Sequence, residues 1–136
     1  MLKPAAAFLI AVSVAPSIAQ AECPVINGTF QFVYKREGGQ DYFYQVEIYT
    51  RQERGRFSYT WDTKTSIIAD GKFYPIRVGE QEGELRHACE DGTLLRELRR
   101  KGSDKIWWKR FKVLNRMEIE ITGNYPGKSG IYQKQL

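Results

Sequence analysis

The chain has few of the residues from which metal centres and nucleophilic active sites are built. Its 136 residues include one histidine, His87, and two cysteines, Cys23 and Cys89. A zinc site needs three or four nitrogen, sulfur or oxygen ligands, and a Ser-His-Asp triad is assembled around a histidine. The sequence also has no phosphate-binding glycine loop. We therefore predict a protein that has no metal, cofactor or catalytic residues and is not an enzyme.

Long apolar runs are scarce as well, because the only one lies at the N-terminus. Residues 1–21 combine one cation, an apolar stretch over 5–15 and a small-residue end over 19–21. This layout is typical of a cleaved secretory signal of bacterial type, with cleavage after Ala21. Pro16 interrupts the apolar run well before it could span a membrane, which takes about 20 residues. We expect residues 1–21 to be removed, and residues 22–136 to form one domain, without a transmembrane segment, in the periplasm or outside the cell.

Export determines how the two cysteines are interpreted. In an oxidising compartment Cys23 and Cys89 are expected to form a disulfide. The closed loop is long, so the chain-entropy model assigns the bond roughly 4 kcal/mol. A disulfide would leave no thiolate to pair with His87, which we expect to be packed inside the domain or at its rim. Lipidation of Cys23 is the alternative, although Glu22 stands where a small residue is preferred.

Helical periodicity is absent from the remaining chain, which alternates with a period of two. Phe57, Tyr59 and Trp61, for example, are separated by Ser58 and Thr60. Alternating aromatic and β-branched residues predict β-strands. We expect about ten strands, near residues 29–36, 41–51, 56–62, 65–69, 73–79, 84–90, 93–100, 104–114, 116–122 and 130–135.

Turn residues separate neighbouring strands at short intervals and predict hairpins, as at Asp70-Gly71 and Asp91-Gly92. So many short strands in one small domain favour a closed sheet, because closure removes the free edges. The predicted fold is all-β, a single antiparallel meander closed into an up-and-down barrel of eight to ten strands. A barrel of this size either is filled by side chains or holds one small ligand.

Four segments that cover roughly residues 69–134, ADGKFYPIRVGE, DGTLLRELRRKG, MEIEITG and GIYQKQ, resemble those of small secreted lipocalin-like β-barrels of the calycin type. In such barrels an Asp-Gly-Lys-x-Tyr-Pro hairpin precedes a Thr-Leu strand and a terminal tyrosine strand. Classical lipocalins carry Gly-x-Trp where this chain has Gly28-Thr29-Phe30. The resemblance implies a barrel that binds a molecule rather than transforming it, and it transfers no catalytic residue.

Large aromatic side chains at the expected inward positions predict an apolar interior. We expect this interior to bind a hydrophobic or amphipathic anionic small molecule, or a lipid. A filled barrel remains the alternative, since it needs the same side chains. The candidate ligand-binding residues are Phe30, Phe32, Tyr44, Phe57, Tyr59 and Trp61.

Positive charge is concentrated in one hairpin. Residues 96–116 contain nine basic and two acidic residues, whereas residues 22–136 as a whole contain 20 basic and 16 acidic ones. Within this hairpin, Trp107 and Trp108 must face opposite sides of a regular strand. The candidate residues of this basic, aromatic surface are Arg99, Trp107, Trp108, Lys109, Arg110 and Lys112.

This hairpin allows several interpretations. It can form the charged mouth of the barrel, dock to anionic lipid, or bind an acidic envelope protein, which makes an interaction or inhibitor module the alternative function. Cationic side chains on a solvated strand face need no ligand at all. Export disfavours nucleic acid as a partner.

Overall fold

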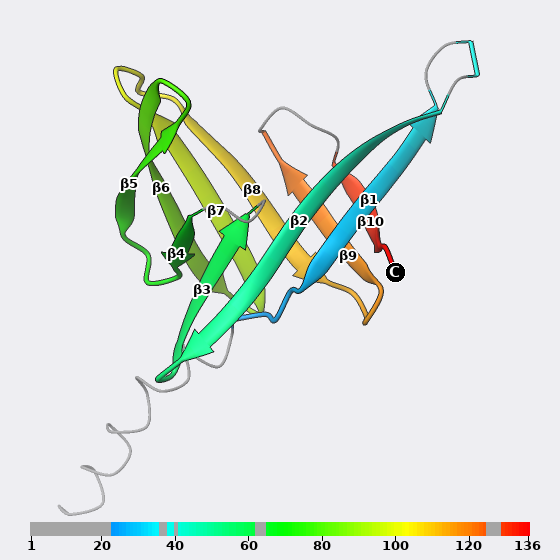
Figure 1. The fold of residues 1–136 in the computed structure, drawn as a ribbon, viewed down its shortest axis with the longest axis horizontal. Helices are drawn as coiled ribbons and strands as arrows, with labels where there is room; N and C mark the ends of the chain where they lie inside the picture. The colour runs from blue at the N-terminus through cyan, green and yellow to red at the C-terminus, as the bar shows by residue number, and fades with distance from the viewer. Residues whose placement is uncertain (1–22, 36–37, 40, 62–64, 125–128) are drawn as a thin grey trace, which may run out of the picture.

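The computed structural model describes residues 23–35, 38–39, 41–61, 65–124 and 129–136. The predicted signal peptide at residues 1–21 lies outside them. The described residues form ten β-strands and no helix (Figure 1). The strands are β1 (Gly28–Lys35), β2 (Asp41–Glu53), β3 (Arg56–Trp61), β4 (Ser66–Ile68), β5 (Phe73–Val78), β6 (Gln81–Glu90), β7 (Thr93–Arg100), β8 (Ile106–Val113), β9 (Glu118–Gly123) and β10 (Gly130–Lys134).

All ten strands belong to one antiparallel sheet. Its order is β4-β3-β2-β1-β10-β9-β8-β7-β6-β5, so consecutive strands pair with each other except β4 and β5, which form the two ends of the sheet, and β1 pairs with β10. The sheet curls into a nearly closed barrel, as the facing groups of strands in Figure 1 show. The predicted all-β, up-and-down barrel is therefore confirmed.

Two-residue turns connect several of these strands. Arg54 and Gly55 join β2 to β3 with φ values of 53° and 77°, and Asp91 and Gly92 join β6 to β7 with 49° and 77°. Positive φ at both central residues defines the type I′ turn, whose twist matches that of paired strands. The Asp91-Gly92 pair therefore makes the hairpin that its sequence predicts.

The barrel is nearly closed at a seam where the two end strands of the sheet, β4 and β5, both lie against β6. β5 pairs with β6 along the ladder, and β4 contacts β6 as well. The imidazole Nδ1 of His87 on β6 lies 3.2 Å from the carbonyl oxygen of Ile67 on β4. The backbone N–H of Gly71, between β4 and β5, donates to the carbonyl oxygen of His87 at 2.9 Å. A side-chain contact thus joins the two ends of the sheet at this seam.

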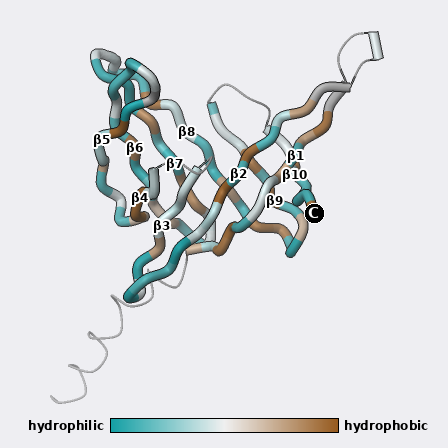
Figure 2. Tube along the Cα trace, viewed as in Figure 1, coloured by the Kyte–Doolittle hydropathy of each residue, from teal (hydrophilic) through white to brown (hydrophobic). Residues whose placement is uncertain are grey.

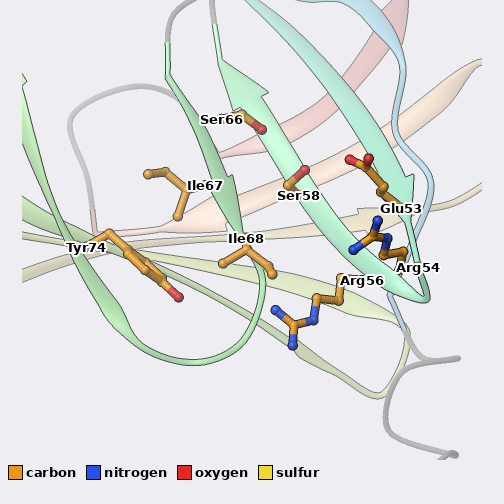
Figure 3. Close-up of a pocket in the computed structure, with 8 residues that line it drawn as sticks. All are labelled: Glu53, Arg54, Arg56, Ser58, Ser66, Ile67, Ile68 and Tyr74. Atoms are coloured by element: carbon orange, nitrogen blue, oxygen red, sulfur yellow. The ribbon is translucent and has the colours of Figure 1, made fainter.

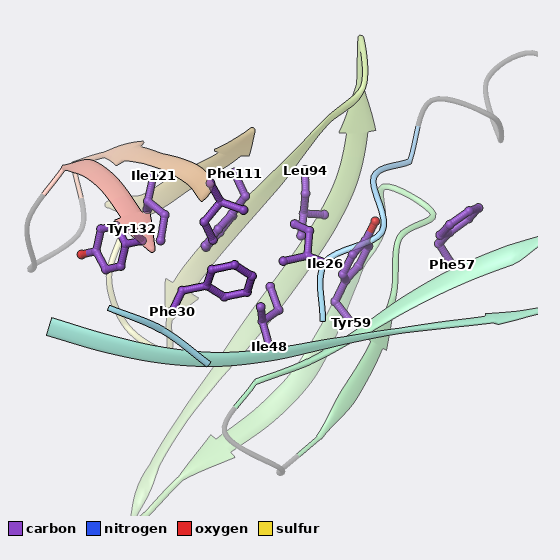
Figure 4. Packing of buried hydrophobic residues seen from close by; sticks show 10 residues of the cluster. Ile26, Phe30, Ile48, Phe57, Tyr59, Leu94, Phe111, Ile121 and Tyr132 are labelled. Atoms are coloured by element: carbon purple, nitrogen blue, oxygen red, sulfur yellow. The ribbon is translucent and has the colours of Figure 1, made fainter. Parts of the chain in front are cut away.

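The core lies inside the barrel, where inward-facing residues of most strands meet (Figure 4). Figure 2 shows hydrophobic residues spaced along the strands, with hydrophilic residues at the β2–β3 and β5–β6 turns. Burial of large aliphatic and aromatic side chains is the main term that stabilises such a sheet. The main cluster consists of Ile26, Phe30, Ile48, Phe57, Tyr59, Leu94, Phe111, Ile119, Ile121 and Tyr132.

The segment before β1 is fixed across one end of the barrel. Cys23 forms a disulfide with Cys89 at a Cα–Cα distance of 5.1 Å, which confirms the predicted pairing. The hydroxyl of Tyr59 donates to the carbonyl oxygen of Pro24 at 2.6 Å, and the backbone N–H of Ile26 donates to Oγ1 of Thr50 at 2.7 Å. Ile26 is fully buried among the core residues. This segment therefore fills the end of the barrel near the β6–β7 turn.

Candidate functional site

Two cations face the interior of the barrel from neighbouring strands. Arg96 on β7 lies opposite Lys109 on β8, and two residues along each strand Leu94 lies opposite Phe111. Leu94 and Phe111 are fully buried in the core. Because side chains two residues apart in a strand share a face, Arg96 and Lys109 also point inward. The sheet thus places two like charges side by side within the barrel.

A cavity of about 210 Å³ lies against these two cations. It occupies the part of the barrel away from the N-terminal segment, beyond the layer formed by Leu94 and Phe111. The described residues that line it include two tryptophans and two cations but no carboxylate. They are Gln45, Val46, Trp61, Arg96, Leu98, Trp107 and Lys109.

Trp61 is held in place by three contacts. The guanidinium carbon of Arg96 lies 4.2 Å from the centroid of its ring, within the range of a cation–π interaction. His87 stacks on Trp61 with ring centroids 5.4 Å apart, and Phe111 meets it edge-on at 4.9 Å. A side chain restrained on several sides loses little further freedom when a ligand binds, so Trp61 gives the cavity a preorganised wall.

Trp107 forms a second aromatic wall from β8. It lies opposite Leu98 on β7, two residues from Arg96 and on the same face. The ammonium Nζ of Lys105 lies 3.9 Å from the centroid of the Trp107 ring. A third cation therefore stands close to the cavity, although it does not line it.

His87 is the only buried charged or polar side chain among the described residues. Burial and, to a smaller extent, the nearby positive charge of Arg96 together lower the pKa of His87 to about 3, while the contact with the Ile67 carbonyl opposes the shift. His87 is therefore neutral at physiological pH. It packs behind Trp61 rather than lining the cavity.

The six predicted aromatic interior residues fall into three groups. Phe30, Phe57 and Tyr59 are buried in the core, where burial also raises the pKa of the Tyr59 hydroxyl. Only Trp61 of the six lines the cavity. The remaining two lie toward the opposite end of the barrel from the disulfide: Phe32 stacks on Tyr132 at 5.3 Å, and Tyr44 is 38% exposed.

The basic hairpin is divided between the two faces of the sheet. Trp107 and Lys109 face the cavity, as described above, whereas Trp108, Arg110 and Lys112 alternate with them and face outward. On this outer face, arginine side chains form ion pairs with carboxylates of β6 and β7. Arg99 lies 3.0 Å from Glu84, Arg110 lies 3.7 Å from Glu90, and Arg86 pairs with Glu97.

A second hollow lies along the seam of the barrel (Figure 3). It is larger, at about 780 Å³, and is lined by the β2–β3 turn, β3, β4 and Tyr74 of β5. Ser58, Ser66 and Ile68 alternate with the buried Tyr59 and Ile67, so they lie on the outer face. This groove is more open to solvent than the interior cavity, and we regard the interior cavity as the better ligand site.

Sequence reasoning named none of Arg96, Val46, Leu98 and Gln45 among the candidate site residues. The hairpin of residues 96–116, which it considered as the charged mouth of the barrel, does contain Arg96 and Leu98. In β7, Leu94 and Leu95 are adjacent, so hydrophobic alternation does not reveal whether Arg96 or Glu97 faces inward. In β8, Trp107 and Trp108 create the same ambiguity for Lys109 and Arg110. The register between β7 and β8 resolves both ambiguities, because Arg96 and Lys109 share the face of the buried Leu94 and Phe111.

Comparisons of the chain with protein-family models, curated proteins and solved structures gave no match. In the described part of the chain, no group of three or more His, Cys, Asp or Glu side chains is arranged to hold a metal ion. A search of the same residues for helices of membrane-spanning length and hydrophobicity found none.

Proposed function

We propose that the protein is an exported barrel that binds a small amphipathic anion in its interior. The observation that carries this proposal is the cavity of about 210 Å³, in which Trp61 and Trp107 stand beside Arg96 and Lys109. Apolar walls with a few convergent polar groups are typical of small-molecule sites. The resemblance to lipocalin-like barrels, which bind rather than catalyse, supports the same interpretation.

The size of the cavity limits the ligand. An engineered protein cavity of roughly 150 Å³ holds a benzene molecule, and pockets for drug-sized ligands occupy about 300 Å³ or more. Ile26, Leu94 and Phe111 fill the barrel on the side of the N-terminal segment. The interior therefore suits a compact molecule better than a long acyl chain.

Export is part of the proposal. Residues 1–21 have the layout of a secretory signal, and the disulfide between Cys23 and Cys89 suits an oxidising compartment. We therefore place the protein in the periplasm or outside the cell, where a small barrel can capture molecules that pass through the envelope.

Capture of an acidic protein by the hairpin of residues 96–116 is the weaker alternative. Arg99 and Arg110 already face Glu84 and Glu90 on the outer surface. Exposed ion pairs contribute little to stability, but they reduce the field that attracts an acidic partner. Lys109 points inward and is not available on that surface.

The test is native mass spectrometry of the mature protein purified from the exported fraction. We expect a mass excess that is lost on denaturation. Val46→Trp would fill the cavity and should abolish the excess, whereas Val33→Trp, at a position that is 58% exposed, should retain it. The proposal is wrong if the wild-type protein carries nothing, or if both variants retain the bound molecule equally.

A further inference from the structure

We infer that a groove at one end of the barrel binds the acyl chain of an acidic amphiphile, whose acidic group is held by Arg116 and Lys134. The groove has a volume of about 650 Å³ and lies between the segment before β1 and the β8–β9 turn, which meet at the same end of the barrel (Figure 1). It shares no lining residue with the interior cavity. The inference therefore goes beyond the proposed function and does not depend on it.

Most of the side chains that line this groove are apolar. Its floor is formed by Ile26, Phe30 and Ile119, which belong to the core and are at most 3% exposed. Its walls include Val25 and Met117, which are 60% and 41% exposed. Exposed apolar side chains that gather at one place mark a binding surface. Because only one aromatic ring is found among the described lining residues, the groove suits an aliphatic chain.

Hydrogen bonds hold both walls of the groove in place. In the β8–β9 turn, the backbone N–H of Met117 donates to Oδ1 of Asn115 at 2.9 Å. The backbone N–H of Lys134 donates to the carbonyl oxygen of Met117 at 2.7 Å, which fixes the turn to β10. On the other side, Ile26 exchanges two backbone hydrogen bonds with the Thr50 hydroxyl, at 2.7 and 2.8 Å. A groove that is already formed needs little ordering when a ligand binds.

The charged residues of the groove indicate an anionic head group. Arg116 of the turn and Lys134 of β10 line it, and no carboxylate is found among the described lining residues. Neither cation forms an ion pair with a carboxylate in the part of the chain that the structure describes. Hydrogen bonds from such cations to a carboxylate are roughly twice as strong as those between neutral groups. An apolar body with one acidic end therefore complements this groove.

The volume of the groove indicates a chain rather than a compact molecule. At about 650 Å³ it is about three times as large as the interior cavity, and it falls within the range of about 300 to 1,000 Å³ that is usual for small-molecule sites. Met117 is flexible and unbranched, so its side chain can adapt to a chain that lies beside it. Burial of each methylene group should raise the affinity about two- to fourfold.

The test is titration calorimetry of the mature protein with dodecanoate, octanoate and dodecyltrimethylammonium, each below its micelle-forming concentration. We expect dodecanoate to bind at least about tenfold more tightly than octanoate, because its chain is longer. It should also bind at least about tenfold more tightly than dodecyltrimethylammonium, which has a similar chain and the opposite charge. Arg116→Gln and Lys134→Gln should each weaken dodecanoate binding by about threefold or more. Lys112→Gln is the control, because Lys112 lies opposite Glu120 on the outer face of the sheet and does not line the groove.

A matched pair of variants tests the apolar wall. Val25→Asp places a negative charge in the groove and should weaken dodecanoate binding by at least about tenfold. Val33→Asp makes the same change at a position on β1 that is 58% exposed and does not line the groove, and it should bind as the wild type does. Circular dichroism verifies that both variants are folded.

The outcomes separate this inference from the proposed function. Val46→Trp fills the interior cavity and should leave dodecanoate binding unchanged. Loss of binding in Val46→Trp but not in Val25→Asp would place the chain inside the barrel, which overturns the groove site and supports the proposed function. Failure of dodecanoate to bind, or equal binding of dodecyltrimethylammonium, overturns the inference and leaves the proposed function untouched. Binding to phosphatidylglycerol vesicles without binding of monomeric dodecanoate also overturns it, since the surface would then contact a membrane.

Discussion

His87 on β6 lies with its Nδ1 3.2 Å from the carbonyl oxygen of Ile67 on β4, and this contact spans the seam of the barrel. The ring is fully buried, edge-on to Tyr59 and stacked on Trp61. The charged side chain of Arg96, from the opposed position on β7, lies near it and disfavours a second positive charge. A neutral imidazole therefore belongs to the folded state.

Acid should destabilise the protein through His87. Its pKa is about 3 in the fold and 6.5 as an ordinary value, so the unfolded chain takes up the proton first as the pH falls. The free energy of unfolding should therefore decrease between pH 6.5 and 3, by up to about 1.4 kcal/mol per pH unit. Urea unfolding at pH 7.5, 6, 5 and 4 measures this. His87→Gln cannot titrate and should show a shallower decrease; equal slopes for both proteins would refute the role of His87.

Reduction of the disulfide should also destabilise the fold. The bond closes a loop between residues 66 positions apart, which corresponds to roughly 4 kcal/mol of stabilisation. We expect the thermal midpoint to fall by more than about 10 °C in reductant. The double variant Cys23→Ser/Cys89→Ser should start from the lower midpoint and be unaffected by reductant. A wild-type midpoint that reductant does not change would contradict the expectation.

Gly123 should not tolerate a larger side chain. It ends β9 opposite Lys109, and an added Cβ would overlap the carbonyl oxygen of Trp108 and lie 3.0 Å from the Cα of Lys109. Backbone atoms cannot move aside without displacing β8, so Gly123→Ala should cost about 1 to 3 kcal/mol. Thr122→Ala, one residue earlier on the outer face, provides the comparison and should cost less. Denaturant unfolding of the two variants measures the difference.

Trp61 and Trp108 should differ in their effect on ligand retention. Trp61→Ala removes a cavity wall and should release the bound molecule, while also costing about 3 to 5 kcal/mol of stability. Trp108→Ala removes an outward ring and should leave retention intact. Native mass spectrometry, with circular dichroism to verify folding, measures both. Retention by Trp61→Ala at the wild-type level would exclude Trp61 from the site.

The fold could be predicted from local sequence features. Alternation at Phe57, Tyr59 and Trp61 and turns such as Asp91-Gly92 predict strands and hairpins, and short-range chemistry is enough to specify them. The cysteine pairing followed from the number of cysteines and the predicted export signal. Strands and hairpin turns depend on residues that are close in the sequence, and two cysteines allow only one intramolecular disulfide.

The cavity could not be predicted in the same way, because it depends on register. Sequence reasoning placed Lys109 with the outer cations, since Trp107 and Trp108 are adjacent and each could face inward. The register with Leu94 and Phe111 turns Lys109 and Arg96 toward the interior. Likewise, the aromatic residues Phe30 and Tyr59 suited a ligand wall or a filled core equally well, and packing around Ile26 places them in the core.

The chain contains three tryptophans, and their indole N–H signals offer the most direct test of the interior site. Nitrogen-15 NMR spectra are recorded for the protein as purified from the exported fraction and again after denaturation, extraction and refolding. We predict that the signals of Trp61 and Trp107, which line the cavity, shift between the two spectra, and that of Trp108 does not. Unchanged signals for Trp61 and Trp107, or a shift confined to Trp108, would contradict binding within the barrel.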